Sequence, residues 1–288
     1  MNLKQALSRA TEVLTGLADT DDPAFESEVL LRHVLNISRT QFFLDLGKEI
    51  DPQAASLFRE WVKRRSVGEP VAYIIGRREF FGLDFYIDSR VLVPRPETEL
   101  LVEEAINYAK AYLKANSSQK EITIADIGTG SGAVAVSLAV NLPESQIYAS
   151  DISASALAVA LINCRKHNVT EQVILLQGDL LDPLSAPVNI LVANLPYVTR
   201  AEVAQMSSAR YEPALALDGG ESGLDQIFQL CGQLKGKVLR GGCVLLEIGL
   251  GQDEAVTNLL KSLFPASEIE SLTDLAGVHR AIKLSLKE

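Results

Sequence analysis

The first seventy residues carry the hydrophobic spacing of short amphipathic helices. Apolar positions recur three or four residues apart from Leu3 to Leu17, again from Pro23 to Val34, and a third time from Pro52 to Arg65. This spacing predicts three helices, and a proline at the first position of a helix is well tolerated. Residues 1–70 contain no constellation of catalytic side chains, so we expect a small helical bundle there.

The pattern changes after a glycine and a proline at positions 68 and 70. Residues 79–88 are rich in β-forming side chains around Gly82, which predicts a hairpin or an extended linker. The next segment, residues 91–99, holds Arg95 between two prolines, and we expect this stiff loop to border the functional site. Thr98 is expected to cap a helix that begins at residue 99.

From Ile122 onward, strands are predicted to alternate with helices, which is typical of a parallel sheet covered on both faces. Strands are expected at 122–127, 146–149, 173–176, 188–193 and 243–248, and helices at 133–140, 153–167, 223–234 and 253–263. The apolar positions of the tail predict a final edge hairpin. The fold class is therefore α/β, with a seven-stranded, mostly parallel, Rossmann-like sheet and an antiparallel C-terminal edge strand. We expect domain boundaries at 1–70 for the bundle, 71–96 for a β-hairpin linker and 97–288 for the sheet domain.

One strand ends in a corner that can grip a planar group. The apolar run over 188–193 is followed by Asn194-Leu195-Pro196-Tyr197. Pro196 cannot donate to a sheet ladder and restricts Leu195 to an extended conformation. Open α/β sheets bind ligands at this end of their strands. The Asn194 amide, the Leu195 carbonyl and the Tyr197 ring suit a flat group that bears an NH2.

A glycine-rich turn follows the first strand of the sheet. Its sequence is Gly128-Thr129-Gly130-Ser131-Gly132. Glycines let a ligand approach the backbone closely at the N-terminus of the following helix. Because the turn also satisfies the dinucleotide-binding fingerprint, a nicotinamide-dependent oxidoreductase stays open as an alternative.

Three acids at successive strand ends favour a different nucleotide. Asp126 lies two residues before the first glycine, where its carboxylate would repel a pyrophosphate and attract an ammonium group. Asp151 follows the second strand, and Asp179 follows the third, where it can face an adenine amino group. We therefore expect S-adenosylmethionine, a cationic nucleotide without phosphate.

Composition narrows the class of partner. The 288 residues have a formal charge of −10, which argues against a generic nucleic-acid binder. No apolar run is long enough to span a bilayer, and the first residues contain no signal-peptide core. Three widely spaced cysteines without a Cys-x-x-Cys pair fit a reducing cytoplasm, and three scattered histidines predict no metal site. We expect a cytoplasmic monomer.

With these residues placed, the chain resembles class I S-adenosylmethionine-dependent methyltransferases that act on planar nitrogens. More narrowly, the segments 94–99, 211–220, 223–225 and 274–280 resemble the HemK/PrmC-like protein-(glutamine-N5) methyltransferases. The resemblance covers essentially the whole chain. It implies methyl transfer to a glutamine in the GGQ loop of peptide chain release factors 1 and 2, with S-adenosylhomocysteine as the product. The helical domain would recognise the protein substrate.

The expected site residues follow from the motifs and this resemblance. The catalytic set is Asn194, Leu195, Pro196 and Tyr197, and the cofactor-binding set is Asp126, Gly128, Thr129, Gly130, Ser131, Gly132, Asp151, Asp179, Leu180, Asn194 and Arg95. One position departs from the family, which usually has proline where this chain has Leu195. The resulting corner resembles that of ribosomal-RNA adenine dimethyltransferases. An adenine-N6 methyltransferase acting on RNA or DNA therefore stays an alternative, as does a non-catalytic scaffold.

Overall fold

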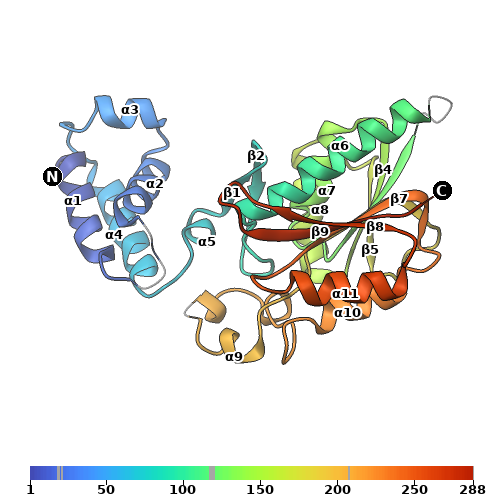
Figure 1. Ribbon diagram of the computed structural model, residues 1–288. Helices are drawn as coiled ribbons and strands as arrows, with labels where there is room; N and C mark the ends of the chain where they lie inside the picture. The colour runs from blue at the N-terminus through green and yellow to red at the C-terminus, as the bar shows by residue number, and fades with distance from the viewer. Residues whose placement is uncertain (18–19, 21, 117–120, 207, 288) are drawn as a thin grey trace. The chain divides into compact units, whose positions relative to one another are not determined.

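The chain divides into two compact units. The computed structural model describes residues 1–288 except 18–19, 21, 117–120, 207 and 288 (Figure 1). One unit comprises residues 1–77 and 206–211, and the other comprises residues 78–205 and 212–288. The boundaries predicted at residues 70 and 96 stay a prediction. Within the described part of the chain, no helix is long and apolar enough to cross a membrane.

The first unit is helical. Its helices are α1 (Leu3–Leu14), α2 (Pro23–Leu35), α3 (Arg39–Leu44), α4 (Pro52–Ser66) and α5 (Val71–Ile75), with a 3₁₀ turn η2 (Ser208–Arg210). The three predicted helices are confirmed, whereas the short helices α3 and α5 were not predicted. Asp22 and Asp51 cap α2 and α4, each just before a proline. Leu14, Leu30 and Phe42 are fully buried in the shared core.

A two-stranded hairpin follows along the chain. The sequence predicted either a hairpin or an extended linker here, and the structure has the hairpin. Strands β1 (Arg77–Phe80) and β2 (Leu83–Tyr86) pair with each other. The two residues between them, Phe81 and Gly82, have φ angles of 50° and 71°. Two consecutive positive φ angles give the turn a twist that matches the right-handed twist of the strands.

The second unit is built on a seven-stranded sheet, counted over the described residues. The strands are β3 (Ile122–Ile127), β4 (Ser145–Asp151), β5 (Val173–Gln177), β6 (Val188–Ala193), β7 (Val238–Glu247), β8 (Glu268–Thr273) and β9 (His279–Ser285). Their order is β5-β4-β3-β6-β7-β9-β8. The first five are parallel, while β9 runs antiparallel between β7 and β8. The predicted fold class is confirmed.

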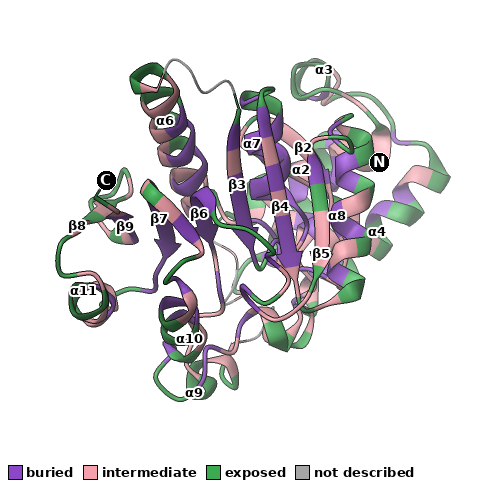
Figure 2. Cartoon of the chain, turned by 90° about the vertical axis from the view of Figure 1, so that its right-hand side faces the viewer, coloured by how far each residue is buried: buried purple, intermediate pink, exposed green. Residues whose placement is uncertain are grey.

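Helices cover both faces of this sheet (Figure 1). On one face lie α6 (Glu99–Ala115), α7 (Ala133–Asn141) and α8 (Ala154–Lys166), and on the other α10 (Asp225–Gln233) and α11 (Asp253–Leu263). Shorter elements are η1 (Pro96–Thr98), α9 (Arg200–Val203) and η3 (Ala214–Ala216). Figure 2 shows the central strands buried along most of their length. Apolar runs such as 188–193, buried at every position, are typical of strands covered on both faces.

Two local predictions differ from the structure. Thr98 precedes α6, but its side chain makes no capping hydrogen bond, so the predicted cap is wrong. Its hydroxyl has a partner distant in sequence instead, which is described below. Strand β7 begins at Val238, five residues earlier than predicted, because a shift in its register with β6 accommodates Gly241 and Gly242. Glycines interrupt the apolar run, so periodicity alone misses this extension.

Candidate active site

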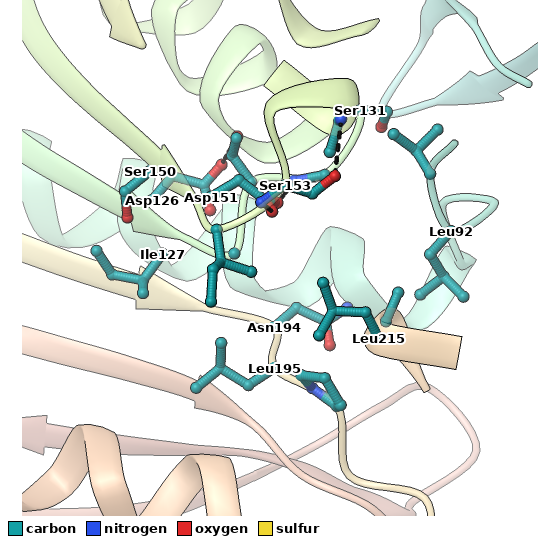
Figure 3. Close-up of a pocket in the computed structure, with 18 of the residues that line it drawn as sticks. Leu92, Asp126, Ile127, Ser131, Ser150, Asp151, Ser153, Asn194, Leu195 and Leu215 are labelled. Atoms are coloured by element: carbon teal, nitrogen blue, oxygen red, sulfur yellow. Dashed lines mark hydrogen bonds between the residues drawn. The ribbon is translucent and has the colours of Figure 1, made fainter. Parts of the chain in front are cut away.

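The carboxyl ends of strands β3 to β6 border a cavity of about 290 Å³ in the second unit. The predicted residues that line it are Arg95, Asp126, Gly128, Thr129, Gly130, Ser131, Asp151, Asp179, Leu180, Asn194, Leu195 and Pro196. Figure 3 shows Asp126, Asp151 and Ser153 on one side of the opening and the Asn194 corner on the other. Gly132 and Tyr197 are not among the described residues that line this cavity.

The glycine turn is braced by two carboxylates. Asp126 Oδ2 accepts hydrogen bonds from Thr129 Oγ1 at 2.6 Å and from the Ala135 N–H at 3.1 Å. Asp151 Oδ2 accepts the Gly130 N–H at 2.9 Å. The φ angle of Gly130 is 54°, in the left-handed region that glycine adopts without strain. The turn is therefore a rigid cradle in which two acids face one ligand-sized space.

Burial makes these acids hard to ionise in the absence of a cation. It raises the pKa of Asp126 to about 6, although hydrogen bonds from Thr129 and Ala135 partly oppose the rise. Burial likewise raises the pKa of Asp151, against hydrogen bonds from Ser153 and Gly130. A positive group placed beside them would stabilise their ionised forms and bind more tightly for that reason.

The third predicted acid lies at the outer part of the site. Asp179 is half-buried, and its Oδ2 accepts a hydrogen bond from Gln229 Nε2 at 3.3 Å. The next residue, Leu180, is buried with φ at 45°, a conformation that costs energy for a side chain of its size. Ser150 Oγ donates to the Leu180 carbonyl at 3.3 Å and helps to hold it. Strained backbone of this kind is often found at ligand sites.

The corner after β6 is packed tightly on both sides. Leu195 is 6% exposed, and a Cβ added to Gly128 would lie 3.0 Å from Leu195 Cδ2. The side chain at this position therefore presses on the glycine turn. On the other side, Gln252 Nε2 donates to the Tyr197 carbonyl at 3.0 Å, and Gly249 has no room for a Cβ without crowding the Tyr197 ring.

The side chain of Asn194 is held by a residue from another element. Asn194 Nδ2 donates to Thr98 Oγ1 at 3.0 Å, and Thr98 is 4% exposed. Among the described residues, none donates a hydrogen bond to Asn194 Oδ1 or to the Leu195 carbonyl. Two acceptors at the edge of the cavity are thus available to a ligand.

A buried carboxyl group lies behind the corner. Tyr197 Oη donates to Glu247 Oε1 at 3.2 Å, and Glu247 is 2% exposed at the end of β7. Burial raises the pKa of Glu247 to about 7, while the nearby Thr98 hydroxyl and the hydrogen bond from Tyr197 oppose the rise. Burial also raises the pKa of the Tyr197 hydroxyl, so it stays a hydrogen-bond donor at neutral pH.

The loop between the hairpin and α6 is fixed by a second buried acid. Arg95 Nη2 contacts Glu212 Oε2 at 2.7 Å, and the side chain of Glu212 is fully buried. Glu212 Oε1 also accepts the Val93 N–H at 3.2 Å. An arginine paired in this way positions the loop that borders the cavity.

Sequence reasoning missed the roles of Thr98, Glu212, Glu247 and Gln252. Thr98 lies in segment 94–99 and Glu212 in segment 211–220, two of the segments that carry the family resemblance. The sequence therefore marked both residues but did not show which residues they contact. Glu247 is an acid at the end of an apolar strand and beside the predicted corner strand. Its place at the end of an apolar run is a local signal, but only the sheet order puts it beside the corner.

The charges of the lining suit a cationic ligand that lacks phosphate. Its carboxylates come from Asp126, Asp151, Asp179 and Asp218. Its arginines are already paired, Arg90 with Asp88 at 2.6 Å and Arg95 with Glu212. These residues fit S-adenosylmethionine and disfavour a pyrophosphate. Among the described residues, no cluster of His, Cys, Asp and Glu suits a metal ion.

Comparison with known proteins agrees with the motifs. The PrmC N-terminal domain model matches residues 5–76, and the methyltransferase small domain model matches residues 102–211. A release factor glutamine methyltransferase of Moorella thermoacetica is 40% identical over 97% of each chain. Another, of Chlorobaculum tepidum, is 35% identical over 91% of this chain and 90% of its own.

A solved structure supports the fold. The hMettl16 catalytic domain, in complex with MAT2A 3′UTR hairpin 6, superposes with a TM-score of 0.54 over 83% of each chain. At 15% identity this likeness speaks for the methyltransferase fold alone. The two release factor glutamine methyltransferases, which match this chain over most of its length, support the narrower family assignment and confirm the resemblance seen in the motifs. The chain belongs to the family of release factor glutamine methyltransferases.

Proposed function

We propose that this protein transfers a methyl group from S-adenosylmethionine to the side-chain amide nitrogen of a glutamine in the GGQ loop of peptide chain release factors. The observation that carries the proposal is the pair of unused acceptors, Asn194 Oδ1 and the Leu195 carbonyl, beside an acidic cavity. A primary amide has two N–H donors in one plane, which these two acceptors can receive together. The relatives named above carry the same activity in their names.

The cofactor would be held by the cradle and its acids. Asp126 suits the ammonium of the methionine moiety, the turn 128–132 suits close approach of the ligand to the backbone, and Asp151 suits the ribose hydroxyls. Asp179 and Leu180 would contact the adenine, and Arg95 would close the site from its loop. When bound, the cofactor supplies an electrophilic methyl group on a positively charged sulfur.

The chain's own contribution is chiefly alignment. A glutamine amide nitrogen is a weak nucleophile because its lone pair is delocalised into the carbonyl. Acceptance of one N–H by Asn194 Oδ1 and the other by the Leu195 carbonyl orients this nitrogen and favours its pyramidal form. Alignment of this kind can supply roughly 7–11 kcal/mol of the barrier. We assign no general base, since a methylated amide cation loses its proton readily to water.

The test is direct. Purified protein, S-adenosylmethionine and a release factor are incubated, and the products are digested and sequenced by mass spectrometry. The proposal requires one added methyl group on the glutamine of the Gly-Gly-Gln segment. Label on a different residue, or no label on any release factor, would overturn it.

The three alternatives left open by the sequence are less well supported. Adenine methylation of RNA or DNA is favoured by Leu195 but opposed by the charge of −10 and by the names of the relatives. An oxidoreductase is opposed by Asp126 at the cavity. A non-catalytic scaffold is opposed by the Asn194-Leu195-Pro196-Tyr197 corner, because a scaffold would not need it. Transfer of a labelled methyl group from the cofactor to nucleic acid rather than to protein would favour adenine methylation.

For the helical unit we propose recognition of the protein substrate, within the boundaries 1–70, 71–96 and 97–288. Phe43 and Leu44 are 51% and 75% exposed, and Arg39 lies 5.8 Å from the rings of Phe25 and Phe43. Exposed aromatic and arginine side chains are typical of binding hot spots. Phe43→Ser should raise KM for a whole release factor and leave KM for a short glutamine peptide unchanged. We also propose a cytoplasmic monomer that acts on release factors 1 and 2.

A further inference from the structure

We infer that Gln252 is a positioning residue for methyl transfer, because its side chain anchors the end of the corner at 194–197 from the loop between β7 and α11. This inference rests on the proposed function, since it concerns the Leu195 carbonyl and the Tyr197 ring that would hold the substrate amide. It assigns Gln252 no contact with substrate or cofactor. Gln252 is not among the described residues that line the cavity.

The backbone of the corner has little hydrogen bonding of its own. Strand β6 ends at Ala193, and Pro196 has no N–H to donate. Among the described residues, Gln252 Nε2 supplies the one hydrogen bond made by the backbone of residues 195–197, to the Tyr197 carbonyl at 3.0 Å. Because the proline ring also fixes the φ angle of Pro196, restraint at Tyr197 is transmitted to the Leu195 carbonyl two residues earlier.

The polar atoms of the Gln252 side chain are all used to join loops. Its Nε2 donates to the Tyr197 carbonyl and, at 3.2 Å, to the Gly223 carbonyl, while its Oε1 accepts the Gly249 N–H at 2.8 Å. A primary amide has donors on one side and an acceptor on the other, so this set of partners fixes its orientation. Gln252 directly precedes α11, yet its side chain makes no capping hydrogen bond there. The side chain therefore serves the corner rather than the helix.

Buried glycines bring the surrounding loops close enough for these hydrogen bonds. A Cβ on Gly219 would lie 2.6 Å from the Pro196 carbonyl oxygen, and a Cβ on Gly249 would lie 3.1 Å from Tyr197 Cδ2. At Gly223 a Cβ would collide with the Tyr197 carbonyl oxygen, and the φ angle of 72° also favours glycine. The loops that precede α10 and α11, two helices that pack against each other (Figure 1), thus close around the corner.

Loss of this anchor should affect alignment more than cofactor binding. The acids proposed to hold the cofactor, Asp126, Asp151 and Asp179, lie at the ends of β3, β4 and β5, whereas Gln252 acts on the corner after β6. Displacement of reacting groups by about 1 Å can cost about 10²-fold in rate. Release of the Tyr197 carbonyl should therefore lower kcat and leave cofactor affinity unchanged.

The experiment measures methylation of a whole release factor at saturating cofactor. Gln252→Met keeps the length of the side chain and removes its hydrogen bonds. Gln252→Glu keeps an acceptor for the Gly249 N–H but loses both donors. Each should lower kcat by about 10–10²-fold with unchanged affinity for S-adenosylhomocysteine. Gln252→Lys returns a donor for the two carbonyls and should recover part of the loss.

Gln172 provides the matched control. Its Nε2 also donates two hydrogen bonds, to the Leu142 carbonyl at 2.6 Å and to Ser145 Oγ at 2.9 Å, but at the amino ends of β4 and β5. Gln172→Met should therefore lower Tm about as much as Gln252→Met does and leave kcat unchanged. A comparable loss of kcat in both variants would show a general structural effect and would overturn the inference.

Hydrogen exchange supplies a readout that needs no turnover. The Val198 N–H, directly after the corner, donates to the Leu217 carbonyl at 3.2 Å. A peptide that spans residues 194–200 should exchange faster in Gln252→Met and Gln252→Glu, and at the wild-type rate in Gln172→Met.

Wild-type kcat in both Gln252 variants would overturn the inference. A loss of kcat with unchanged exchange, or with an equal loss of S-adenosylhomocysteine affinity, would overturn it as well. If exchange responds as expected but the wild-type protein methylates no release factor, the proposed function is overturned instead.

Discussion

Strand β6 has an asparagine at each end, and the two are held in opposite ways. At the amino end, Asn189 Oδ1 accepts the Thr123 N–H and hydroxyl, both at 2.9 Å, while its buried Nδ2 has no partner among the described residues. Beyond the carboxyl end, Asn194 donates its NH2 to Thr98 and keeps its oxygen free. Both asparagines contact a threonine, yet the oxygen is used internally in one pair and left for a ligand in the other.

The difference lies in the direction of the hydrogen bond between each asparagine side chain and its threonine. The Thr123 hydroxyl donates to Asn189 Oδ1 at 2.9 Å and accepts the Asn189 N–H at 3.2 Å. The Thr98 hydroxyl instead accepts the Asn194 NH2 at 3.0 Å. The same pair of residue types thus serves structure at one end of the strand and, under the proposed function, ligand binding at the other.

The largest effect should separate the two asparagines. Asn194→Ala removes an acceptor needed in the transition state and should lower kcat by about 10²–10³-fold or more, with S-adenosylhomocysteine affinity retained. Asn189→Ala leaves two donors of Thr123 unsatisfied and should cost about 1–3 kcal/mol of stability with kcat unchanged. Methylation kinetics and denaturant titration of both variants measure the contrast. Equal kcat values would remove the distinction between the two ends.

The next contrast is between Gly128, near the carboxyl end of β6, and Gly242, near its amino end. Gly128→Ala puts a Cβ at a φ of 73° and 3.0 Å from Leu195 Cδ2, so it should weaken cofactor binding by about tenfold or more. In Gly242→Ala the new Cβ meets the Asn189 carbonyl at 2.7 Å, which should destabilise the fold. Calorimetric titration with S-adenosylhomocysteine is the measurement. Wild-type affinity in Gly128→Ala would argue against the cradle.

Acids at the carboxyl end should make ligand binding depend on pH. The pKa of Asp126 is raised to about 6 by burial, and a bound ammonium group favours the ionised form. Affinity for S-adenosylhomocysteine should therefore be constant above pH 7 and fall by up to about tenfold per unit below 6. Methylthioadenosine, which lacks the ammonium, is the control and should show no such fall. A parallel fall for both ligands would place the effect elsewhere.

The smallest effect on methylation is expected for the structural threonine, Thr123. Thr123→Val removes two hydrogen bonds between the Thr123 hydroxyl and Asn189, one donated to Oδ1 and one accepted from its N–H. It should cost about 1–3 kcal/mol, measured as a shift in the denaturation midpoint at constant m value. Methylation rates should match those of the wild-type protein. A large loss of kcat would show that both ends of β6 influence the site.

The sequence predicted the frame of this site because its signals are local. Apolar runs located the strands, and Pro196 predicted a corner because proline ends a strand whatever surrounds it. The acids gather because the carboxyl ends of parallel strands meet at one edge of the sheet. This is why Asp126, Asp151 and Asn194 line one cavity although up to 68 residues separate them (194 − 126 = 68).

What the sequence left out depends on contacts between distant residues. Thr98 obeys the local rule for a helix cap, but Asn194, 96 residues away, binds its hydroxyl in the structure. Glu212 and Arg95 are 117 residues apart, so the sequence around one does not indicate that it pairs with the other. Glu247 looks like an ordinary strand end until β7 is placed beside β6. Single-sequence patterns carry no information on such pairs.

The central claim is that the corner after β6 receives both hydrogens of a substrate amide. A crystal structure with S-adenosylhomocysteine and a glutamine-containing peptide from a release factor tests it most directly. We predict that the glutamine nitrogen lies about 2.7–3.2 Å from both Asn194 Oδ1 and the Leu195 carbonyl. A glutamine nitrogen bound elsewhere, with Asn194 turned to present its NH2, would contradict the claim.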